Sequence, residues 1–456
     1  ILLGGTAATI LKGRGSLQDI DQISILKSVC KQCISIHKVK EIVPAIEQAF
    51  RLAQSGVPGP VFVECPIDIL YDEELVRNWY GAKSNETPPK NLRERALRWY
   101  INFHANRLFA GKETVKFNSP PIKPEITATN PNDIAAAERL LKKSKKPLLI
   151  TGSGAMMQPQ KSQELADSVK KLGIPVYLSG MARGLLGKED SLQMRHKRKE
   201  AIKAADLIIL AGVPNDFRLD YGNHIGGRTF ISINRSKEDL YKNKKPPLAI
   251  EADPAETLIS LASKYTAEHT SWIDELRQLN QKRDDEIISQ ANETLNGGIN
   301  PLALFHNLDD TLGANTIFVA DGGDFVGTAV YTVRPRAPLS WLDPGVFGTL
   351  GVGAGFALGA KLVFPEKDVW IIYGDGSAGF SLMEYDTFAR HNLPVVSVIG
   401  NDACWGQIAR DQVEFLKSDC AMNLAHKAKE NISDGKPYII NSILGKSDFR
   451  KGSISV

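Results

Sequence analysis

Cysteine is scarce in this chain. Only 5 cysteines occur among 456 residues, and Cys30 and Cys33 form its one Cys-x-x-Cys pair. Five are too few for a disulfide scaffold in a chain of this length, and a zinc site of the common four-cysteine type would need a second pair. Both cysteines stand among apolar residues. We therefore expect buried thiols that pack in a core, in preference to a redox pair.

Long apolar runs and an excess of one charge are also missing. No stretch of about eighteen uninterrupted apolar residues occurs, and no basic, apolar leader opens the chain, so we expect no membrane span in these residues. Lys and Arg number 56 and Asp and Glu 52, a formal charge of +4. The densest basic cluster, 142–146, ends a predicted helix, where cations are favourable. We expect it to be solvated surface, and we expect no nucleic-acid partner.

The composition that remains is typical of a large globular protein. Hydrophobic residues make up 43% and charged residues 24% of the 456 positions, enough for two or three domains with their own cores. Short apolar runs bounded by glycine or proline alternate with segments of helical period. This alternation predicts an α/β fold of doubly wound parallel sheets, with helices on both faces.

Proline-rich and glycine-rich stretches divide the chain into blocks. The predicted boundaries are a first block at 1–80, a linker at 81–130, a second block at 131–265, a helical linker at 266–299 and a third block at 300–456. The first block opens on the apolar residues Ile1–Gly5, which predict a buried strand, and it ends with a predicted helix at 43–55 and a strand at Val61–Pro66.

The second block contains a predicted helix and a series of apolar strands. The helix is expected near Asn132–Lys143, and the strands are expected at 147–151, 176–178, 207–210 and 230–233. The turn at 152–154 resembles the first half of a dinucleotide-binding fingerprint, but Met157 stands where the third glycine belongs. We therefore favour a structural turn between strand and helix. Charged helices are expected at about 257–292.

Polar residues follow two neighbouring strands of the third block. The apolar run 369–373 leads into Gly-Asp-Gly-Ser at 374–377, a helix is predicted at 384–390, and the strand 395–399 leads into Gly-Asn-Asp-Ala-Cys at 400–404. The carboxyl ends of strands are where open α/β sheets bind their ligands. This order therefore places an acid and a second polar ligand at the same edge of a sheet.

That combination suits a diphosphate held through a hard cation. Magnesium prefers oxygen ligands, and unobstructed backbone N–H groups bind phosphate oxygens. Asp375 offers a carboxylate, Gly376 and Ser377 offer amides at the start of a helix, and Asn401 or Asp402 completes the metal shell. A lone Gly-Asp-Gly is common in turns, but the extended pattern of strand, motif, helix, strand and Asn-Asp is far more specific.

The segment 374–404 resembles the signature of thiamine-diphosphate enzymes, and its surroundings are similar to the acetolactate synthase-like, 2-hydroxyacyl-CoA lyase family. The resemblance implies thiamine diphosphate and Mg²⁺ as cofactors. It aligns Asp402 with the family's second asparagine, the usual metal ligand; Asn401 is the alternative if the turn shifts by one residue. The carbonyl of Cys404 is implied as a third ligand. Gly374, Gly376 and Ser377 are implied to bind the diphosphate.

Two upstream stretches extend the resemblance. The glycine-rich segment 347–355 resembles the one beneath the cofactor's pyrimidine ring, which implies that the carbonyl of Gly348 accepts from the 4′-amino group and that Leu350 wedges the two rings. Close packing of a glycine-rich helix is the alternative. Gly323 and Asp324 resemble the loop that reaches the diphosphate from the other side.

The resemblance covers the whole chain and implies three domains: pyrimidine-binding, central and diphosphate-binding. The glutamate that activates the cofactor in this family would lie before Ile1, so no catalytic residue is assigned, and the last domain is shortened near 424. We therefore expect an N-terminally truncated chain with an incomplete first domain. Such a chain is expected to lend half a site to a partner, since the family's cofactor lies between subunits of a dimer or tetramer.

The implied reaction is cleavage of a 2-hydroxyacyl-CoA to formyl-CoA and an aldehyde one carbon shorter. Segments 342–348 and 400–405 resemble the lyases most, and Trp405 and Gln407 are candidate walls of the substrate pocket, with plain helix packing as the alternative. An acetolactate synthase-type carboligase and a non-catalytic homologue stay open. The family also implies the endoplasmic reticulum membrane, although no anchor stands in these residues.

Overall fold

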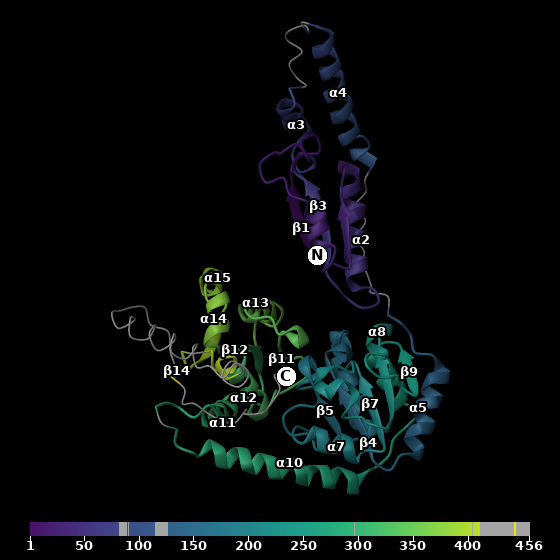
Figure 1. Cartoon of the computed structure of the whole chain (residues 1–456), viewed down its shortest axis with the longest axis vertical. Coiled ribbons are helices and arrows are strands. Elements are labelled where there is room, and N and C mark those ends of the chain that lie inside the picture. The colour runs from purple at the N-terminus through teal and green to yellow at the C-terminus, as the bar shows by residue number, and fades with distance from the viewer. Residues whose placement is uncertain are drawn as a thin grey trace. The chain divides into compact units, whose positions relative to one another are not determined.

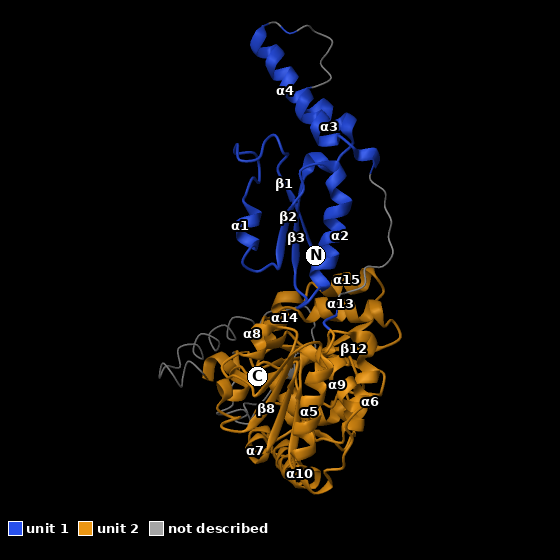
Figure 2. Ribbon diagram, turned by 90° about the vertical axis from the view of Figure 1, so that its right-hand side faces the viewer, with its two compact units in different colours: residues 1–127 blue, residues 128–456 orange. Residues whose placement is uncertain are grey.

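A computed structural model of the chain describes residues 1–81, 89, 91–114, 126–295, 297–403, 405–410 and 442–443 (Figure 1). The chain forms two compact units, Ile1–Thr127 and Ala128–Val456 (Figure 2). Within the described residues, no helix is both long and apolar enough to cross a membrane.

Unit 1 is built on a parallel three-stranded sheet in the order β1-β3-β2. Its strands are β1 (Leu2–Thr6), β2 (Gln32–Ser35) and β3 (Val61–Pro66). Its helices are α1 (Gln22–Leu26), α2 (Ile42–Gln54), α3 (Glu73–Trp79) and α4 (Leu92–Phe109), with 3₁₀ turns η1 (Val39–Glu41), η2 (Ile67–Ile69) and η3 (Lys112–Thr114).

Two expectations for unit 1 are wrong, both because an edge position cannot be seen in a local pattern. The first strand exists, but Leu2 and Leu3 are 47% and 66% exposed, since β1 pairs on one side only. Cys30 and Cys33 are free and only half-buried, because they lie at and just before the other edge strand, β2. Burial and the neighbouring Cys33 still raise the pKa of Cys30.

The first part of unit 2 is a six-stranded parallel sheet in the order β6-β5-β4-β7-β8-β9. The strands are β4 (Pro147–Thr151), β5 (Val176–Leu178), β6 (Gln193–Met194), β7 (Leu207–Ala211), β8 (Thr229–Asn234) and β9 (Leu248–Glu251). The helices are α5 (Pro131–Lys143), α6 (Ser162–Leu172), α7 (Arg198–Ala204), α8 (Lys237–Leu240) and α9 (Pro254–Ala262), and the 3₁₀ turns are η4 (Ser153–Met156), η5 (Pro159–Lys161), η6 (Gly180–Ala182) and η7 (Phe217–Gly222).

The turn after β4 is closed by the neighbouring loop. The N–H of Gly154 donates to the carbonyl of Gly212 at 3.1 Å, and a Cβ atom added at Gly154 would lie 2.8 Å from the Cα of Gly212. The two backbones touch, so these glycines serve close packing, as the structural reading of 152–154 predicts. Helix α5 begins at Pro131, one residue earlier than expected, because the side chain of Asn130 caps it.

The second part of unit 2 is a parallel five-stranded sheet in the order β11-β10-β12-β13-β14. The strands are β10 (Thr316–Asp321), β11 (Trp341–Leu342), β12 (Asp368–Gly374), β13 (Val395–Asn401) and β14 (Ser442–Ile443). The helices are α10 (Thr270–Ala291), α11 (Pro301–Thr311), α12 (Asp324–Thr332), α13 (Gly353–Val363), α14 (Asp375–Ser381) and α15 (Glu384–Arg390), with the 3₁₀ turn η8 (Gly345–Phe347).

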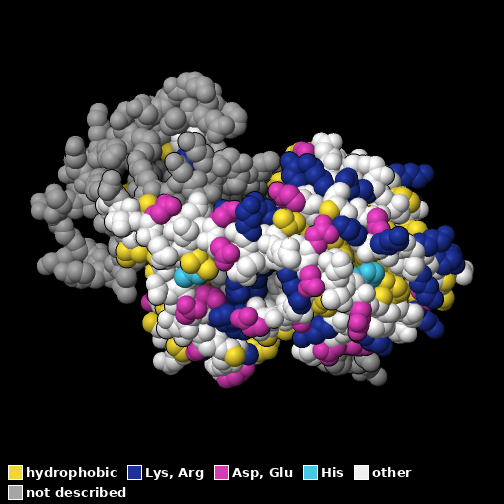
Figure 3. All heavy atoms as spheres, turned by 90° about the horizontal axis from the view of Figure 1, so that it is seen from below, with side chains coloured by type: hydrophobic (Ala, Val, Ile, Leu, Met, Phe, Trp, Pro, Cys, Tyr) yellow, Lys and Arg dark blue, Asp and Glu magenta, His cyan; other side chains and the backbone are white. Residues whose placement is uncertain are grey.

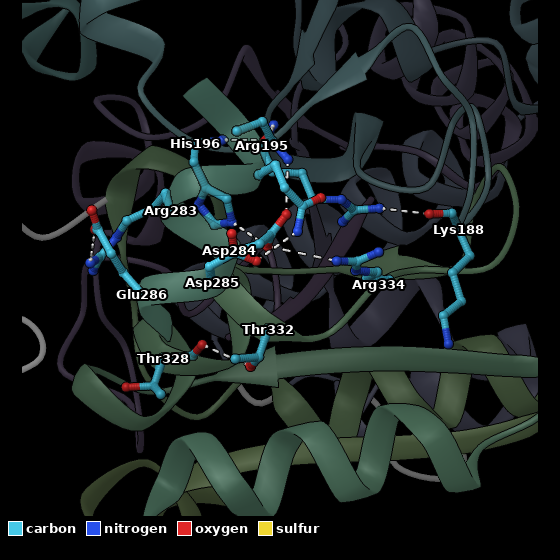
Figure 4. Close-up of polar contacts among 12 residues, drawn as sticks. Lys188, Arg195, His196, Arg283, Asp284, Asp285, Glu286, Thr328, Thr332 and Arg334 are labelled. Atoms are coloured by element: carbon cyan, nitrogen blue, oxygen red, sulfur yellow. Dashed lines mark hydrogen bonds and ion pairs between the residues drawn. The ribbon is translucent and has the colours of Figure 1, made fainter. Parts of the chain in front are cut away.

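Helix α10 connects the two sheets of unit 2 and runs below both of them (Figure 1). Its Asn280 accepts from the backbone N–H groups of Arg195 and His196 at 2.8 and 3.1 Å. Its Asp284 lies between the ring of His196, 3.0 Å away, and the guanidinium of Arg334, 3.7 Å away (Figure 4). The helix therefore fixes the end of β6 against the segment after α12.

Asp284 is charged at this junction. Burial alone raises the pKa of this carboxyl, but the hydrogen bond to His196 and the charges of His196, Arg334 and Arg195 outweigh it, so the net pKa is lowered.

On the face seen from below, basic and acidic side chains are interspersed and neither sign gathers into a large patch (Figure 3).

Candidate functional site

The candidate site lies at the carboxyl ends of β10, β12 and β13, three neighbouring parallel strands. Asp321 is paired in register with Tyr373, and Gly374 with Gly400. The loops that follow these strands therefore leave the sheet at one edge. This edge brings together the predicted residues after Asp321, after Gly374 and after Gly400.

The loops after β10 and β12 are in direct backbone contact. A Cβ atom added at Gly322 would lie 2.7 Å from the N atom of Gly374, and Gly322 has a φ of 153°, which favours glycine. The hydroxyl of Ser377 donates to the carbonyl of Asp321 and lies 2.9 Å from the carbonyl of Gly374. Ser377 is buried, so it joins the two loops as well as standing in the predicted diphosphate segment.

Asp375 is the first residue of α14 and accepts from the N–H of Gly376 at 2.8 Å. Its pKa is raised by burial and by the nearby charge of Asp402, although the N–H groups of Gly376 and Ala403 oppose the rise. A like charge nearby disfavours the ionised form of a carboxyl group. The structure thus brings Asp375 and Asp402 within electrostatic range, as the spacing predicts.

The second candidate ligand pair forms a tight turn after β13. The side-chain oxygen of Asn401 accepts from the N–H of Ala403 at 2.8 Å, and Ala403 has a φ of 54°. The carboxylate of Asp402 lies directly against Gly406, where a Cβ atom would collide with it. Cys404 lies outside the described residues. No group of three or more His, Cys, Asp or Glu side chains in the described part could hold a metal, so the candidate shell depends on Asn401 and backbone oxygens as well.

Trp405 and Gln407 both lie on glycines of the candidate site. A Cβ atom added at Gly376 would lie 2.5 Å from Nε1 of Trp405, and one added at Gly323 would lie 2.6 Å from the amide oxygen of Gln407. Trp405 is nevertheless exposed over part of its surface. Both predicted pocket residues therefore border the loops; the absence of a side chain at Gly376 leaves room for the indole ring of Trp405, whereas the flexible end of Gln407 could shift away from a side chain at position 323.

Asp324 is engaged by a residue that the sequence reasoning missed. It begins α12, and its carboxylate forms a two-point ion pair with the guanidinium of Arg410, with one N–O distance of 2.7 Å. Asp324 and Arg410 are far apart in sequence, and no motif links them. Arg410 thus brings a positive charge that offsets the carboxylate of Asp324 at the edge where Asp324 was predicted to approach a diphosphate.

Gly348 and Leu350 precede α13 in an irregular segment. Gly348 has a φ of 64° and ends the 3₁₀ turn η8, and Leu350 is exposed. The next glycines bind Asp321: its carboxylate accepts from the N–H groups of Gly351 and Gly353 at 3.0 and 2.7 Å. The segment with the two predicted ring-binding residues is thereby fixed to the end of β10.

Asp321 belongs to the loop 321–325 that the resemblance places near the diphosphate, but the sequence predicted no role for its own side chain. It is fully buried, and burial raises its pKa although the N–H groups of residues 351–353 oppose the rise. Its carboxylate fixes one loop and its carbonyl accepts from Ser377 of another, so a single residue connects three segments of the site. The available sequence signal was its place at the end of an apolar strand before two glycines.

Comparisons with known proteins show the family to which the chain belongs. Residues 321–432 match the model of the thiamine pyrophosphate enzyme C-terminal TPP binding domain, and 134–261 match that of the central domain. The chain is 42% identical to 2-hydroxyacyl-CoA lyase 2 of Danio rerio over 100% of this chain and 79% of that protein. It is 40% identical to 2-hydroxyacyl-CoA lyase 2 of Homo sapiens over 100% and 77%. It is 31% identical to acetolactate synthase large subunit IlvG of Mycobacterium tuberculosis (strain ATCC 25618 / H37Rv) over 89% and 67%.

Proposed function

The chain belongs to the thiamine pyrophosphate enzymes, in the family of the 2-hydroxyacyl-CoA lyases, and from that membership we propose that it cleaves 2-hydroxyacyl-CoA thioesters. The products would be formyl-CoA and an aldehyde one carbon shorter. The observation that carries the choice of substrate is the identity of 42% over the whole chain to a protein named as this lyase, against 31% to one named as an acetolactate synthase.

The residues at the carboxyl edge fit the cofactor and a divalent cation. Burial raises the pKa of Asp375 and the charge of Asp402 adds to that rise, and Mg²⁺ would offset both effects through the oxygen ligands it prefers. Asn401 can contribute a third oxygen from the same turn. The binding of Mg²⁺ by these three side chains is part of the proposal.

When bound, thiamine diphosphate supplies a carbanion that adds to a carbonyl and then accepts the electron pair of the neighbouring carbon–carbon bond. The chain's own residues would bind the cofactor and orient its rings. Asp375 and Asp402 would hold the cation on the diphosphate, and Leu350, fixed through Asp321, would set the angle between the two rings. Trp405 and Gln407 would wall the space above Gly376 and Gly323 and limit the access of water.

Cleavage of the substrate would break the bond between C1 and C2. The 2-hydroxyl proton must leave as the aldehyde forms, and a proton must return to C1 before formyl-CoA is released. We assign neither proton to a described residue. An assembly of two or four chains, and attachment to the endoplasmic reticulum membrane, follow from the resemblance and stay predictions.

The test is a direct comparison of substrates. A version of the protein that spans the full length of its relatives, of which this chain covers 79% in the Danio rerio protein, would be supplied with thiamine diphosphate and Mg²⁺ and incubated in parallel with a 2-hydroxyacyl-CoA and with pyruvate. We expect formyl-CoA and the shortened aldehyde in equal amounts from the first and no acetolactate from the second. Acetolactate formation would support the carboligase alternative, and cofactor binding without turnover of either compound would support a non-catalytic homologue.

A further inference from the structure

Helix α4 of unit 1 has two apolar faces, and among the residues that the structure describes only the face near its C-terminal end packs on the unit. Ala105, Leu108 and Phe109 are buried toward the unit's core beside α3. The end of α4 that begins at Leu92 extends beyond the sheet of unit 1 (Figure 2). Within the described part of the chain, the other apolar face of the helix is therefore exposed along that projecting end.

The open face carries large apolar side chains in helical register. Leu92, Trp99 and Phe103 are 83%, 67% and 52% exposed, and exposed Ala96 completes the spacing. At 100° per residue these four positions fall within an arc of about 60°. The rings of Trp99 and Phe103 stack, with centroids 5.5 Å apart, so they form one continuous surface. We call these four residues the aromatic stripe.

Positive charge borders the aromatic stripe on both sides. Arg93, Arg95 and Arg107 are exposed, and helical spacing places Arg95 on one side of the stripe and Arg93 and Arg107 on the other. The acid of the helix, Glu94, lies on the far side and pairs with Arg98 at 2.9 Å. Within the described helix α4, the border of the stripe thus has arginines and no carboxylate.

We propose that the aromatic stripe of α4 binds the surface of an anionic phospholipid bilayer, with the helix lying in the plane of the interface. Trp and Phe side chains insert at the boundary between headgroups and acyl chains, and Tyr100 beside them is also suited to that depth. Arginines extend their stems along the apolar surface while their guanidinium groups reach lipid phosphates. The charge and the aromatic composition thus favour the same partner.

A second copy of the chain is a poorer occupant of the stripe. An apolar stripe of this spacing could pair with its own copy, but each helix would bring arginines to the border and no acid to meet them. Like charges across such a seam oppose pairing. An anionic surface, by contrast, neutralises every border arginine.

The experiment is flotation of the whole chain with lipid vesicles. We expect binding to phosphatidylcholine vesicles that contain phosphatidylserine, and at least about tenfold weaker binding to phosphatidylcholine alone. Trp99→Ser with Phe103→Ser should weaken binding at least about tenfold by removing the inserted rings. Arg93→Glu with Arg95→Glu should weaken it about thirtyfold or more, since each basic residue near the surface contributes about a factor of five.

The control substitutions make similar chemical changes, but on unit 2 and away from the aromatic stripe. Lys143→Glu with Lys145→Glu makes the same change in charge on exposed residues of unit 2, and Tyr241→Ser removes an exposed aromatic ring there. Both should bind like the unchanged chain. Circular dichroism would confirm that each variant is folded.

Three results would overturn the proposal. One is the absence of flotation with anionic vesicles. Another is vesicle binding by the stripe variants that equals the binding of the unchanged chain, or a loss of binding in the control variants that equals the loss in the stripe variants. The last is a dimer in sedimentation that the serine variants dissociate in the absence of lipid, which would assign the stripe to a second copy. None of these outcomes depends on the lyase activity.

Discussion

Replacing Asp321 with alanine should loosen the glycine-rich segment before α13. The change leaves the N–H groups of Gly351 and Gly353 without the carboxylate that accepts them at 3.0 and 2.7 Å. A buried donor left unsatisfied costs about 1–3 kcal/mol, so two cost about 2–6 kcal/mol. The change also removes a buried charge, which is favourable and offsets part of this cost. We therefore expect a net loss of about 2–4 kcal/mol in local stability.

Hydrogen exchange measures that loss where it occurs. A drop of about 2–4 kcal/mol in the free energy of opening speeds amide exchange about thirtyfold to a thousandfold. Mass spectrometry of peptides that cover 348–355 should show this in Asp321→Ala, with a smaller effect in Asp321→Asn, which keeps one acceptor. Asp310→Ala, an exposed acid on α11, is the matched control. Unchanged exchange of the peptide in Asp321→Ala would refute the role given to Asp321.

Three further predictions concern the metal site and the junction of unit 2. Asp375→Ala should abolish Mg²⁺-dependent cofactor binding in calorimetry and leave circular dichroism unchanged; unaltered affinity would remove it as a ligand. Asp402→Asn should change the affinity for Mg²⁺ by no more than about tenfold, or about 1.4 kcal/mol. Complete loss of Mg²⁺ binding would contradict the alignment of Asp402 with the family's metal-binding asparagine. Asp284→Asn should lower the thermal midpoint at neutral pH. Because the folded pKa of Asp284 is lowered, its stabilisation is present above the ordinary carboxyl pKa of 3.8 and is lost as pH falls through the lower folded value, where the difference should vanish.

The strands around the site could be predicted because their signals are local. The apolar run at 369–373 became β12 (Asp368–Gly374), and the run at 395–399 became β13 (Val395–Asn401). A parallel sheet buried on both faces leaves such continuous runs in the sequence. Their parallel pairing then places the residues after Gly374 and Gly400 at one edge, so the meeting of Asp375 with Asp402 followed from topology.

What the sequence missed depends on contacts between distant segments. The charged helices expected at about 257–292 form as α9 and α10, but the position of the break between them was not predicted, and there the chain packs at Ala267 against Gly173 at the end of α6. The pairing of Asp324 with Arg410 joins two loops that no pattern connects. The exposure of Leu2 follows from which strand lies at the edge of a sheet.

A calorimetric titration of the whole folded chain with thiamine diphosphate, in the presence and absence of Mg²⁺, tests most directly whether a cation held by Asp375 and its neighbours binds the cofactor. We predict saturable binding with Mg²⁺ and affinity reduced at least about a hundredfold without it, since two carboxylates would then face the diphosphate. Equal affinity in both solutions, or no binding in either, would contradict the account.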